Sequence, residues 1–241
     1  MDWWPGRSAV PHEMPARQAY DAWASEYPAE AHNPLMHAEE EAMILRLQSP
    51  QHSLQGRKPL QVLDAGAGTG RYTRILRAMG ARTVISLDWS REMLGRQAGD
   101  AERVCGDARR LPFAGGAFDL VNASLMAGDI SNLAAWLSEM ARVLSPGGRV
   151  IYSDFHPAWH ERGWRRTFQD NLGRTIALPC HAHSLDEHRV ALADSGLCVE
   201  AIDEVSVAPQ LNALNRWRPG ARSSVPALVV VSAARMAGAH P

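Results

Sequence analysis

One acidic residue and three glycines fall at every second position in one short stretch of this 241-residue chain, and they define the first candidate site. Asp64 opens the pattern D-x-G-x-G-x-G, which continues with Gly66, Gly68 and Gly70. Glycines let the backbone approach a ligand closely and adopt dihedral angles that are closed to other residues. The pattern differs from the dinucleotide fingerprint G-x-G-x-x-G/A, because Arg71 takes the sixth position. A carboxylate ahead of the loop would repel a pyrophosphate, so we expect a ligand with an ammonium group.

Two more acids lie where a nucleoside could be held. Residues 82–87 predict a second strand that ends at Asp88, and an acid at such a strand end can accept hydrogen bonds from both ribose hydroxyls. Ser90 is the expected N-cap of the helix that follows. Asp107 comes after a third short apolar segment.

A strand, a turn and a helix are needed to position these side chains. Residues 62–65 predict a short buried strand that runs into the glycine turn. In the next segment Tyr72, Ile75, Leu76 and Met79 fall at helical spacing. This order opens a doubly wound α/β domain, whose ligand lies at the carboxyl ends of the strands.

Five motifs in this order resemble those of class I S-adenosylmethionine-dependent methyltransferases. They occupy residues 64–70, 88–94, 104–108, 118–125 and 144–150, and the resemblance covers about residues 60–155. It implies a Rossmann-like α/β fold with a doubly wound sheet of seven mostly parallel strands. The implied strand order is 3-2-1-4-5-7-6, with the seventh strand antiparallel. An N-terminal helical lid belongs to the same pattern.

The resemblance also implies the cofactor, S-adenosylmethionine, and its product, S-adenosylhomocysteine. In the family the glycine loop wraps the methionine part, an Asp like Asp107 accepts from the adenine amino group, and a lid tyrosine like Tyr20 reaches the carboxylate. The implied cofactor residues are Tyr20, Asp64, Gly66, Ala67, Gly68, Asp88, Trp89, Met93, Asp107, Ala108 and Ser124.

The chain is expected to form a single domain over residues 1–241. Its segments are a helical lid over 1–58, a cofactor-binding core over 59–155, a substrate-side insertion over 156–183, and a C-terminal helix and strands over 184–241. The insertion contains aromatic residues but no periodicity, which predicts a segment that shapes the acceptor pocket.

Composition narrows the class of partner. Lys plus Arg is 25 and Asp plus Glu is 26, so the basic excess of a general nucleic-acid binder is missing. No apolar run approaches the roughly 20 residues that span a bilayer. Three cysteines without metal spacing and no secretory signal fit a reducing cytoplasm. We expect a cytoplasmic monomer or homodimer that acts on a small molecule and binds neither nucleic acid nor membrane.

Three residues near the fifth strand and the end of the insertion are candidates for the acceptor side. His156 follows the strand and could take an acceptor proton at neutral pH, with Asp154 beside it and His183 at the end of the insertion. Each histidine could instead hydrogen-bond the backbone and order its loop. No metal is expected, because Mg²⁺ prefers oxygen ligands and no carboxylate cluster is present.

The histidines favour O-methylation, while N- and C-methylation remain open. An RNA methyltransferase, a nucleotide-dependent oxidoreductase and a non-catalytic cofactor-binding protein are the rival functions. Four arginines could recognise an acidic acceptor or form a solvated face: Arg162, Arg165, Arg166 and Arg174. Cys105 and Cys198 fall in strands and are expected to be buried.

Overall fold

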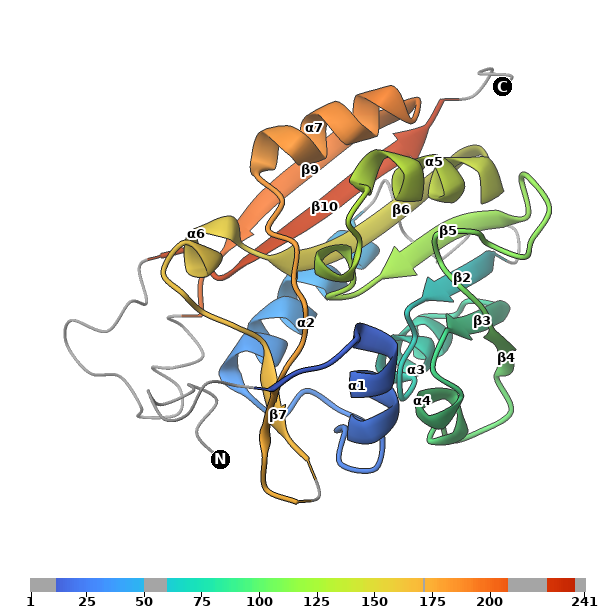
Figure 1. Ribbon diagram of the computed structural model, residues 1–241. Coiled ribbons are helices and arrows are strands. Elements are labelled where there is room, and N and C mark those ends of the chain that lie inside the picture. The colour runs from blue at the N-terminus through green and yellow to red at the C-terminus, as the bar shows by residue number, and fades with distance from the viewer. Residues whose placement is uncertain (1–11, 50–59, 171, 208–224, 237–241) are drawn as a thin grey trace.

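The computed structural model describes residues 12–49, 60–170, 172–207 and 225–236, and Figure 1 shows them as one α/β unit. The large sheet is made of β2 (Gln61–Ala65), β3 (Thr83–Asp88), β4 (Glu102–Cys105), β5 (Phe118–Ala123), β6 (Leu144–Phe155), β9 (Leu197–Val205) and β10 (Leu228–Arg235). Its order is β4-β3-β2-β5-β6-β10-β9, and β10 is antiparallel to both neighbours. The strand order and mostly parallel sheet expected from the sequence are thereby confirmed.

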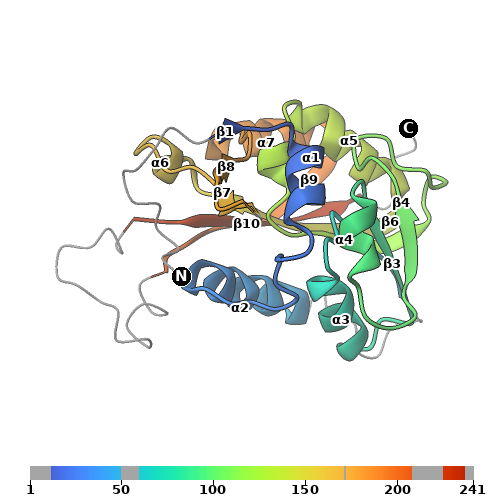
Figure 2. The ribbon, with the colours of Figure 1, turned by 60° about the horizontal axis from the view of Figure 1, so that its bottom comes forward.

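Helices cover both faces of this sheet. The helices of the described chain are α1 (Ala16–Trp23), α2 (Pro34–Gln48), α3 (Arg71–Ala78), α4 (Arg91–Gly95), α5 (Leu133–Val143), α6 (Pro157–His160) and α7 (Leu185–Asp194), with the 3-10 turn η1 (Ala127–Asp129). Figure 2 shows α2 and α3 on one face and α5 and α7 on the other.

Local sequence signals fix where three of these helices begin. The Asn33 side chain accepts from the Met36 amide ahead of α2, and Pro34 occupies the first helical turn. Ser90 caps α4 in the same way. Ser184 and Glu187 form the reciprocal capping box of α7.

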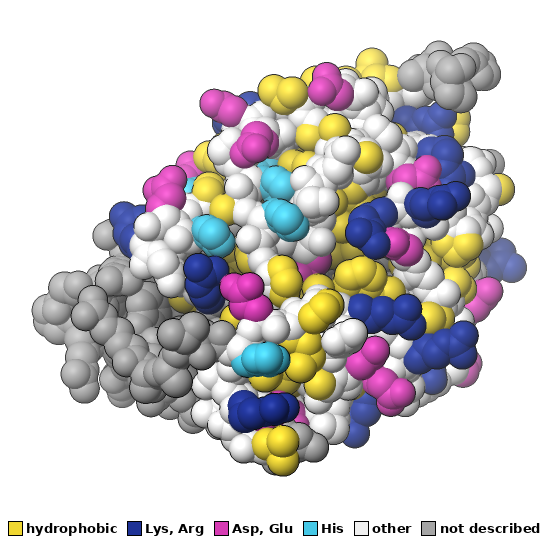
Figure 3. Space-filling model, in the orientation of Figure 1, with side chains coloured by type: hydrophobic (Ala, Val, Ile, Leu, Met, Phe, Trp, Pro, Cys, Tyr) yellow, Lys and Arg dark blue, Asp and Glu magenta, His cyan; other side chains and the backbone are white. Residues whose placement is uncertain are grey.

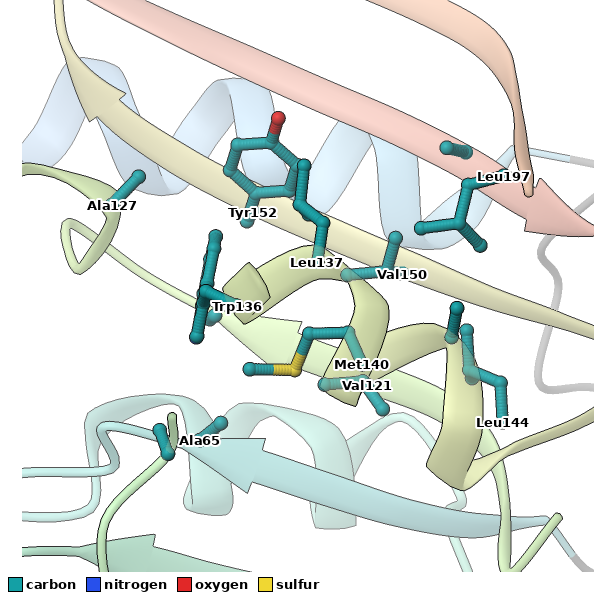
Figure 4. Packing of buried hydrophobic residues seen from close by; sticks show 14 of the residues in the cluster. Ala65, Val121, Ala127, Trp136, Leu137, Met140, Leu144, Val150, Tyr152 and Leu197 are labelled. Atoms are coloured by element: carbon teal, nitrogen blue, oxygen red, sulfur yellow. The ribbon is translucent and has the colours of Figure 1, made fainter. Parts of the chain in front are cut away.

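The hydrophobic core beneath α5 packs against β5 and β6 of the large sheet. Figure 4 shows Trp136, Leu137 and Met140 of α5 packed toward Val121 of β5 and Tyr152 of β6. The Trp136 and Tyr152 rings meet edge to face, with centroids 5.5 Å apart. Burying each large apolar side chain contributes about 1.5–3 kcal/mol. This packing fixes β5 and β6, whose ends carry the site.

The insertion has secondary structure that its sequence does not signal. Strands β7 (Thr167–Gln169) and β8 (Thr175–Ala177) form a hairpin, and β1 (His12–Glu13) pairs with β8 to complete a three-stranded sheet. The Trp23 ring of α1 stacks on Phe168 of β7, with centroids 4.8 Å apart. The lid and the insertion therefore form one layer over the carboxyl ends of the central strands, where the glycine loop lies.

Two expectations about single residues are wrong. Cys105 and Cys198 are exposed, because β4 and β9 are the two edge strands of the large sheet. Arg166 does not belong to a solvated face, since it is only 8% exposed, whereas Arg162 and Arg165 are exposed.

Candidate active site

One cavity of about 1280 Å³ opens where β2, β3, β4 and β5 end. Every residue predicted to hold the cofactor lines it: Tyr20, Asp64, Gly66, Ala67, Gly68, Asp88, Trp89, Met93, Asp107, Ala108 and Ser124. The opposite wall comes from α1 and the insertion. Figure 3 shows hydrophobic side chains between acidic and basic ones on the face that carries α1 and β7. The position agrees with the rule that ligands of doubly wound sheets bind outside the carboxyl ends of the strands.

The glycine loop is folded back onto β3. Gly66, Gly68 and Gly70 have φ angles of 71°, 52° and 83°, which side chains rarely allow. The amides of Gly66 and Ala67 both donate to the Leu87 carbonyl, at 2.8 and 3.0 Å. A Cβ atom at Gly66 would lie 2.7 Å from the Met126 sulfur. The backbone angles therefore favour glycine at all three positions, and at Gly66 a Cβ atom would also force the Met126 side chain to shift.

Asp88 closes the loop from the end of β3. Its Oδ2 accepts from the Gly68 amide at 2.9 Å, and its Oδ1 accepts from the Ser90 amide at 2.8 Å. Burial raises the pKa of this carboxyl to about 6, against the opposing effect of the two backbone donors. The carboxylate therefore lies in the cavity wall with remaining lone pairs that can accept ligand hydroxyls.

Asp64 is more deeply buried than Asp88. It is 1% exposed, and its two oxygens accept from the Thr73 hydroxyl at 2.7 Å and the Asn122 amide at 2.9 Å. Burial raises its pKa, opposed by these two donors. Asp64 ties the glycine loop to α3 and β5, and its negative charge would favour an ammonium group in the adjacent cavity.

Asp107 lies with Trp89 and Arg109 at another part of the wall. Arg109 donates to both Asp107 oxygens, at 2.9 and 2.7 Å, and its guanidinium lies 5.6 Å from the Trp89 ring centroid. The ion pair lowers the pKa of Asp107. A planar group can stack on Trp89 here and hydrogen-bond to Asp107.

A buried glutamate that the sequence did not reveal holds the start of α3, directly after the glycine loop. Glu39 of α2 is fully buried and accepts from four donors: Arg71 at 2.7 Å, Tyr72 at 2.9 Å, Ser124 at 2.7 Å and Ser153 at 2.6 Å. Arg71 at the place of the third dinucleotide glycine was the available signal, because a buried arginine needs an acidic partner.

The lid is fastened at both ends of the cavity. On the cofactor side the Ser90 hydroxyl donates to Asp21 of α1 at 2.5 Å. On the other side the Tyr20 hydroxyl donates to Asp129 of η1 at 2.9 Å, and Asp129 pairs with Arg166 of the insertion. Asp129 was not singled out from the sequence, and its contact with Arg166 could not be predicted, because the two residues lie 37 positions apart.

None of the three acceptor-side candidates lines this cavity. His156 caps α6: its Nδ1 accepts from the Ala158 amide at 3.1 Å, so its Nε2 carries a proton toward Glu204 at 2.9 Å. Nε2 of His183 donates to the Ile130 carbonyl at 2.8 Å. Asp154 is 1% exposed, and its Oδ1 accepts from the Gly128 and Phe155 amides. Both histidines thus hydrogen-bond backbone groups, His156 at the start of α6 and His183 at Ile130, which lies 53 residues away.

Within residues 12–49, 60–170, 172–207 and 225–236, no three His, Cys, Asp or Glu side chains are grouped so as to hold a metal ion. No helix in that part of the chain has the length and apolarity required to cross a membrane.

Comparisons with known proteins agree with this geometry. Residues 63–152 match a family model described as "Methyltransferase domain". A demethylmenaquinone methyltransferase of Mycobacterium sp. (strain KMS) is 46% identical over 165 residues, which cover 66% of this chain and 70% of that protein. A demethylmenaquinone methyltransferase of Beutenbergia cavernae is 42% identical over 111 residues, covering 44% of this chain and 46% of that protein, so this match spans about half of that relative.

Proteins of known structure share this fold. The crystal structure of an S-adenosylmethionine-dependent methyltransferase from Mesorhizobium loti superposes with a TM-score of 0.66 and 24% identity, over 84% of this chain and 100% of that one. The cofactor is S-adenosylmethionine, and the cavity at the glycine loop fits it in size and polarity. The chain belongs to the class I S-adenosylmethionine-dependent methyltransferases.

Proposed function

We propose that the protein transfers the methyl group of S-adenosylmethionine to an oxygen of a small hydroxylated aromatic acceptor. One observation carries this proposal: a single cavity joins the glycine loop to a region lined by aromatic side chains of the lid and the insertion. A volume of about 1280 Å³ leaves room for a second small molecule beside a nucleoside cofactor.

The aromatic lining supports a planar acceptor. Tyr20, Trp23, Phe155, Trp164 and Phe168 all line the cavity. Phe155 and Trp164 pack with centroids 4.6 Å apart, and Trp23 and Phe168 are nearly parallel. Aromatic side chains bind flat rings through offset and edge-on contacts. The two relatives described above are named for demethylmenaquinone, and a reduced quinone is a hydroxylated ring of this kind.

The transfer requires alignment more than acid–base chemistry. The acceptor oxygen attacks the methyl carbon in line with the sulfur, the new C–O bond forms as the C–S bond breaks, and the electron pair leaves with sulfur as a neutral thioether. An ionised phenolic oxygen brings its own electron pair, its proton having gone to solvent. The protein then contributes orientation and exclusion of water, which is consistent with the position of His156 outside the cavity.

A ring carbon is the second candidate for the methylated atom. The same anion carries negative charge on the carbons ortho to its oxygen, so a small rotation of the ring in the cavity would present carbon to the methyl group. The charge balance of the chain supports either small-molecule reaction over nucleic-acid methylation.

Labelled methyl transfer tests the proposal. The protein is incubated with carbon-13-methyl-labelled cofactor and with three probes: a short-chain demethylmenaquinol, catechol and 4-hydroxybenzoate. We expect a labelled product whose carbon-13 shift is that of a methoxy group. A shift typical of an aryl methyl group would assign the reaction to carbon. Protein that binds S-adenosylhomocysteine but labels none of the probes would contradict the proposed acceptor class.

A further inference from the structure

A buried ion pair forms part of the acceptor wall of the cavity. Asp129 of η1 and Arg166 of the insertion both line the cavity, and their side chains are only 10% and 9% exposed. Burying two charges costs solvation that their attraction does not reliably recover, so such a pair is weak evidence for stability. Its place in a ligand cavity points to a role toward the ligand.

Arg166 has more donors than partners. Its Nη2 donates to Asp129, and its Nη1 donates to the Leu125 carbonyl at a long 3.4 Å. Its Nε is buried without a hydrogen-bond partner. A guanidinium carries five N–H donors, and the two Nη atoms of Arg166 make one hydrogen bond each, so Nη–H groups remain for an anionic oxygen in the cavity that Arg166 lines.

The surrounding groups hold the guanidinium in place. Its central carbon lies 5.6 Å from the Tyr20 ring centroid and 5.7 Å from that of Phe155. The Tyr20 hydroxyl is bound to the other oxygen of Asp129. Arg166 is thus fixed between two aromatic faces and one carboxylate, which leaves little side-chain entropy to lose when a ligand binds.

A second unpaired donor lies in the same wall. Trp164 lines the cavity, and its indole N–H is buried without a partner. Its ring packs on Phe155, which in turn packs under Arg166. Because this N–H is buried, Trp164 offers its ring surface, and a flat acceptor that carries an acidic oxygen would meet the aromatic surface of Trp164 and Phe155 beside the Arg166 guanidinium.

We propose that Arg166 binds an ionised oxygen of the acceptor and makes the site selective for the anionic form of a phenol or enol. Asp129 and Tyr20 are positioning residues that hold the guanidinium. The inference rests on the proposed function and deepens it. The charges agree, because the positive sulfonium and Arg166 both favour an anion whose charge is cancelled when the methyl group is transferred.

Binding of a matched pair of dead-end probes tests this without turnover. The probes are 2-hydroxy-1,4-naphthoquinone, an enolate at pH 8, and its neutral 2-methoxy ether. Their dissociation constants are measured by tryptophan fluorescence at saturating S-adenosylhomocysteine. We expect wild-type protein to bind the enolate at least about tenfold more tightly, the size of one charge-assisted hydrogen bond.

Variants assign the preference to one guanidinium. Arg166→Met should lose the preference for the enolate while affinity for the ether stays within about twofold. Because this change strands the Asp129 charge, Asp129→Asn combined with Arg166→Met serves as the second variant; it removes both charges and keeps an acceptor for Tyr20. Arg166→Lys should recover part of the preference. Arg162→Met, which removes an exposed guanidinium of the insertion that does not line the cavity, should keep it in full.

The outcomes separate this inference from the proposed function. Equal affinity of wild type for both probes, or an unchanged preference in the double variant that still binds S-adenosylhomocysteine, overturns the role of Arg166. If the enolate preference depends on Arg166 but no probe acceptor is methylated, the anion site stands and the proposed acceptor class fails. If a methylated product forms without any enolate preference, only the anion site fails.

Discussion

At the scale of single residues, Asp88 predicts how cofactor affinity depends on pH. Its pKa is raised by burial to about 6, and only the carboxylate can accept from both ribose hydroxyls. We expect the dissociation constant of S-adenosylhomocysteine to be constant above about pH 7 and to rise about tenfold per unit below about pH 6. Titration calorimetry between pH 5 and 8 would measure this slope.

Variants of two acids decide whether the slope belongs to Asp88. Asp88→Asn should bind weakly and with no pH dependence in this range. Asp107→Asn is the matched control, because the pKa of Asp107 is already lowered by Arg109 and lies outside the range. A slope that survives in Asp88→Asn would assign the titration to another group.

Asp154 predicts a pH dependence of stability. Burial raises its pKa from 3.8 to about 7, and its Oδ2 has no partner. The folded state therefore prefers the protonated form, so the stabilising effect is complete below about pH 4 and is lost as pH rises to about 7. The loss is at most about 4 kcal/mol, at about 1.4 kcal/mol per pKa unit.

Urea unfolding at pH 5 and pH 8 checks this sign. Wild type should be less stable at pH 8, whereas Asp154→Asn, which keeps the oxygen that accepts from Gly128 and Phe155, should lose most of the difference. Equal pH dependence in the two proteins would show that Asp154 is ionised at little cost in the folded state.

The cofactor side of the cavity could be predicted from the order and spacing of residues along the chain. Asp64, Gly66 and Asp88 could be placed because strand, turn and acid follow one another along the chain, so spacing carries their geometry. Asp129 and Arg166 meet only through the packing of η1 against the insertion, and no spacing reports such a contact. His156 illustrates the opposite error, since a strand-end residue that also precedes Pro157 is used as a helix cap.

At the scale of elements, the lid helix α1 is coupled to the cofactor site through Asp21. Ser90 donates to Asp21 while its amide donates to Asp88, so α1 is fastened beside the expected ribose. Asp21→Ala should weaken S-adenosylhomocysteine binding by about fivefold, the worth of about 1 kcal/mol for one hydrogen bond. Calorimetry and amide exchange of residues 16–23 would measure both effects.

A control on the same helix isolates that coupling. Arg17→Ala changes an exposed residue of α1 and should leave affinity unchanged. Asp21→Ala should also leave the urea midpoint of the core nearly unchanged, because the contact lies outside the main clusters of buried side chains. Unchanged affinity and exchange in Asp21→Ala would mean that the lid is held by Trp23 and Tyr20 alone.

Helices and strands also differ in how well they can be predicted from their own sequences. The strands of the large sheet are short apolar runs between turn residues, and α2, α4 and α7 begin at capping residues, so their existence and order could be predicted. Strands β7 and β8 are three residues each, and β8 also pairs with β1, which lies far away in the sequence. Such short, partly exposed strands owe their shape to their neighbours, and their own sequence carries little signal.

For the whole molecule, cofactor binding should appear as stabilisation of the entire fold. The cavity is lined by residues from α1 to β8, so a ligand in it bridges the lid, the core and the insertion. A ligand that binds only the folded state adds about 2.7 kcal/mol at a hundredfold excess over its dissociation constant. For a chain of 241 residues this raises the melting temperature by roughly 5–10 °C.

Scanning calorimetry with S-adenosylmethionine, S-adenosylhomocysteine and NAD tests whether that stabilisation is specific. Both sulfur ligands should shift a single transition, since lid and core share the ligand. NAD should not, because the Asp64 carboxylate beside the glycine loop would repel a pyrophosphate. Asp88→Ala should lose most of the shift, and Glu92→Ala, an exposed acid in the adjoining helix, should retain it. A shift confined to part of a split transition would mean that lid and core bind the ligand independently, and the coupling through Asp21 and Tyr20 would then be wrong.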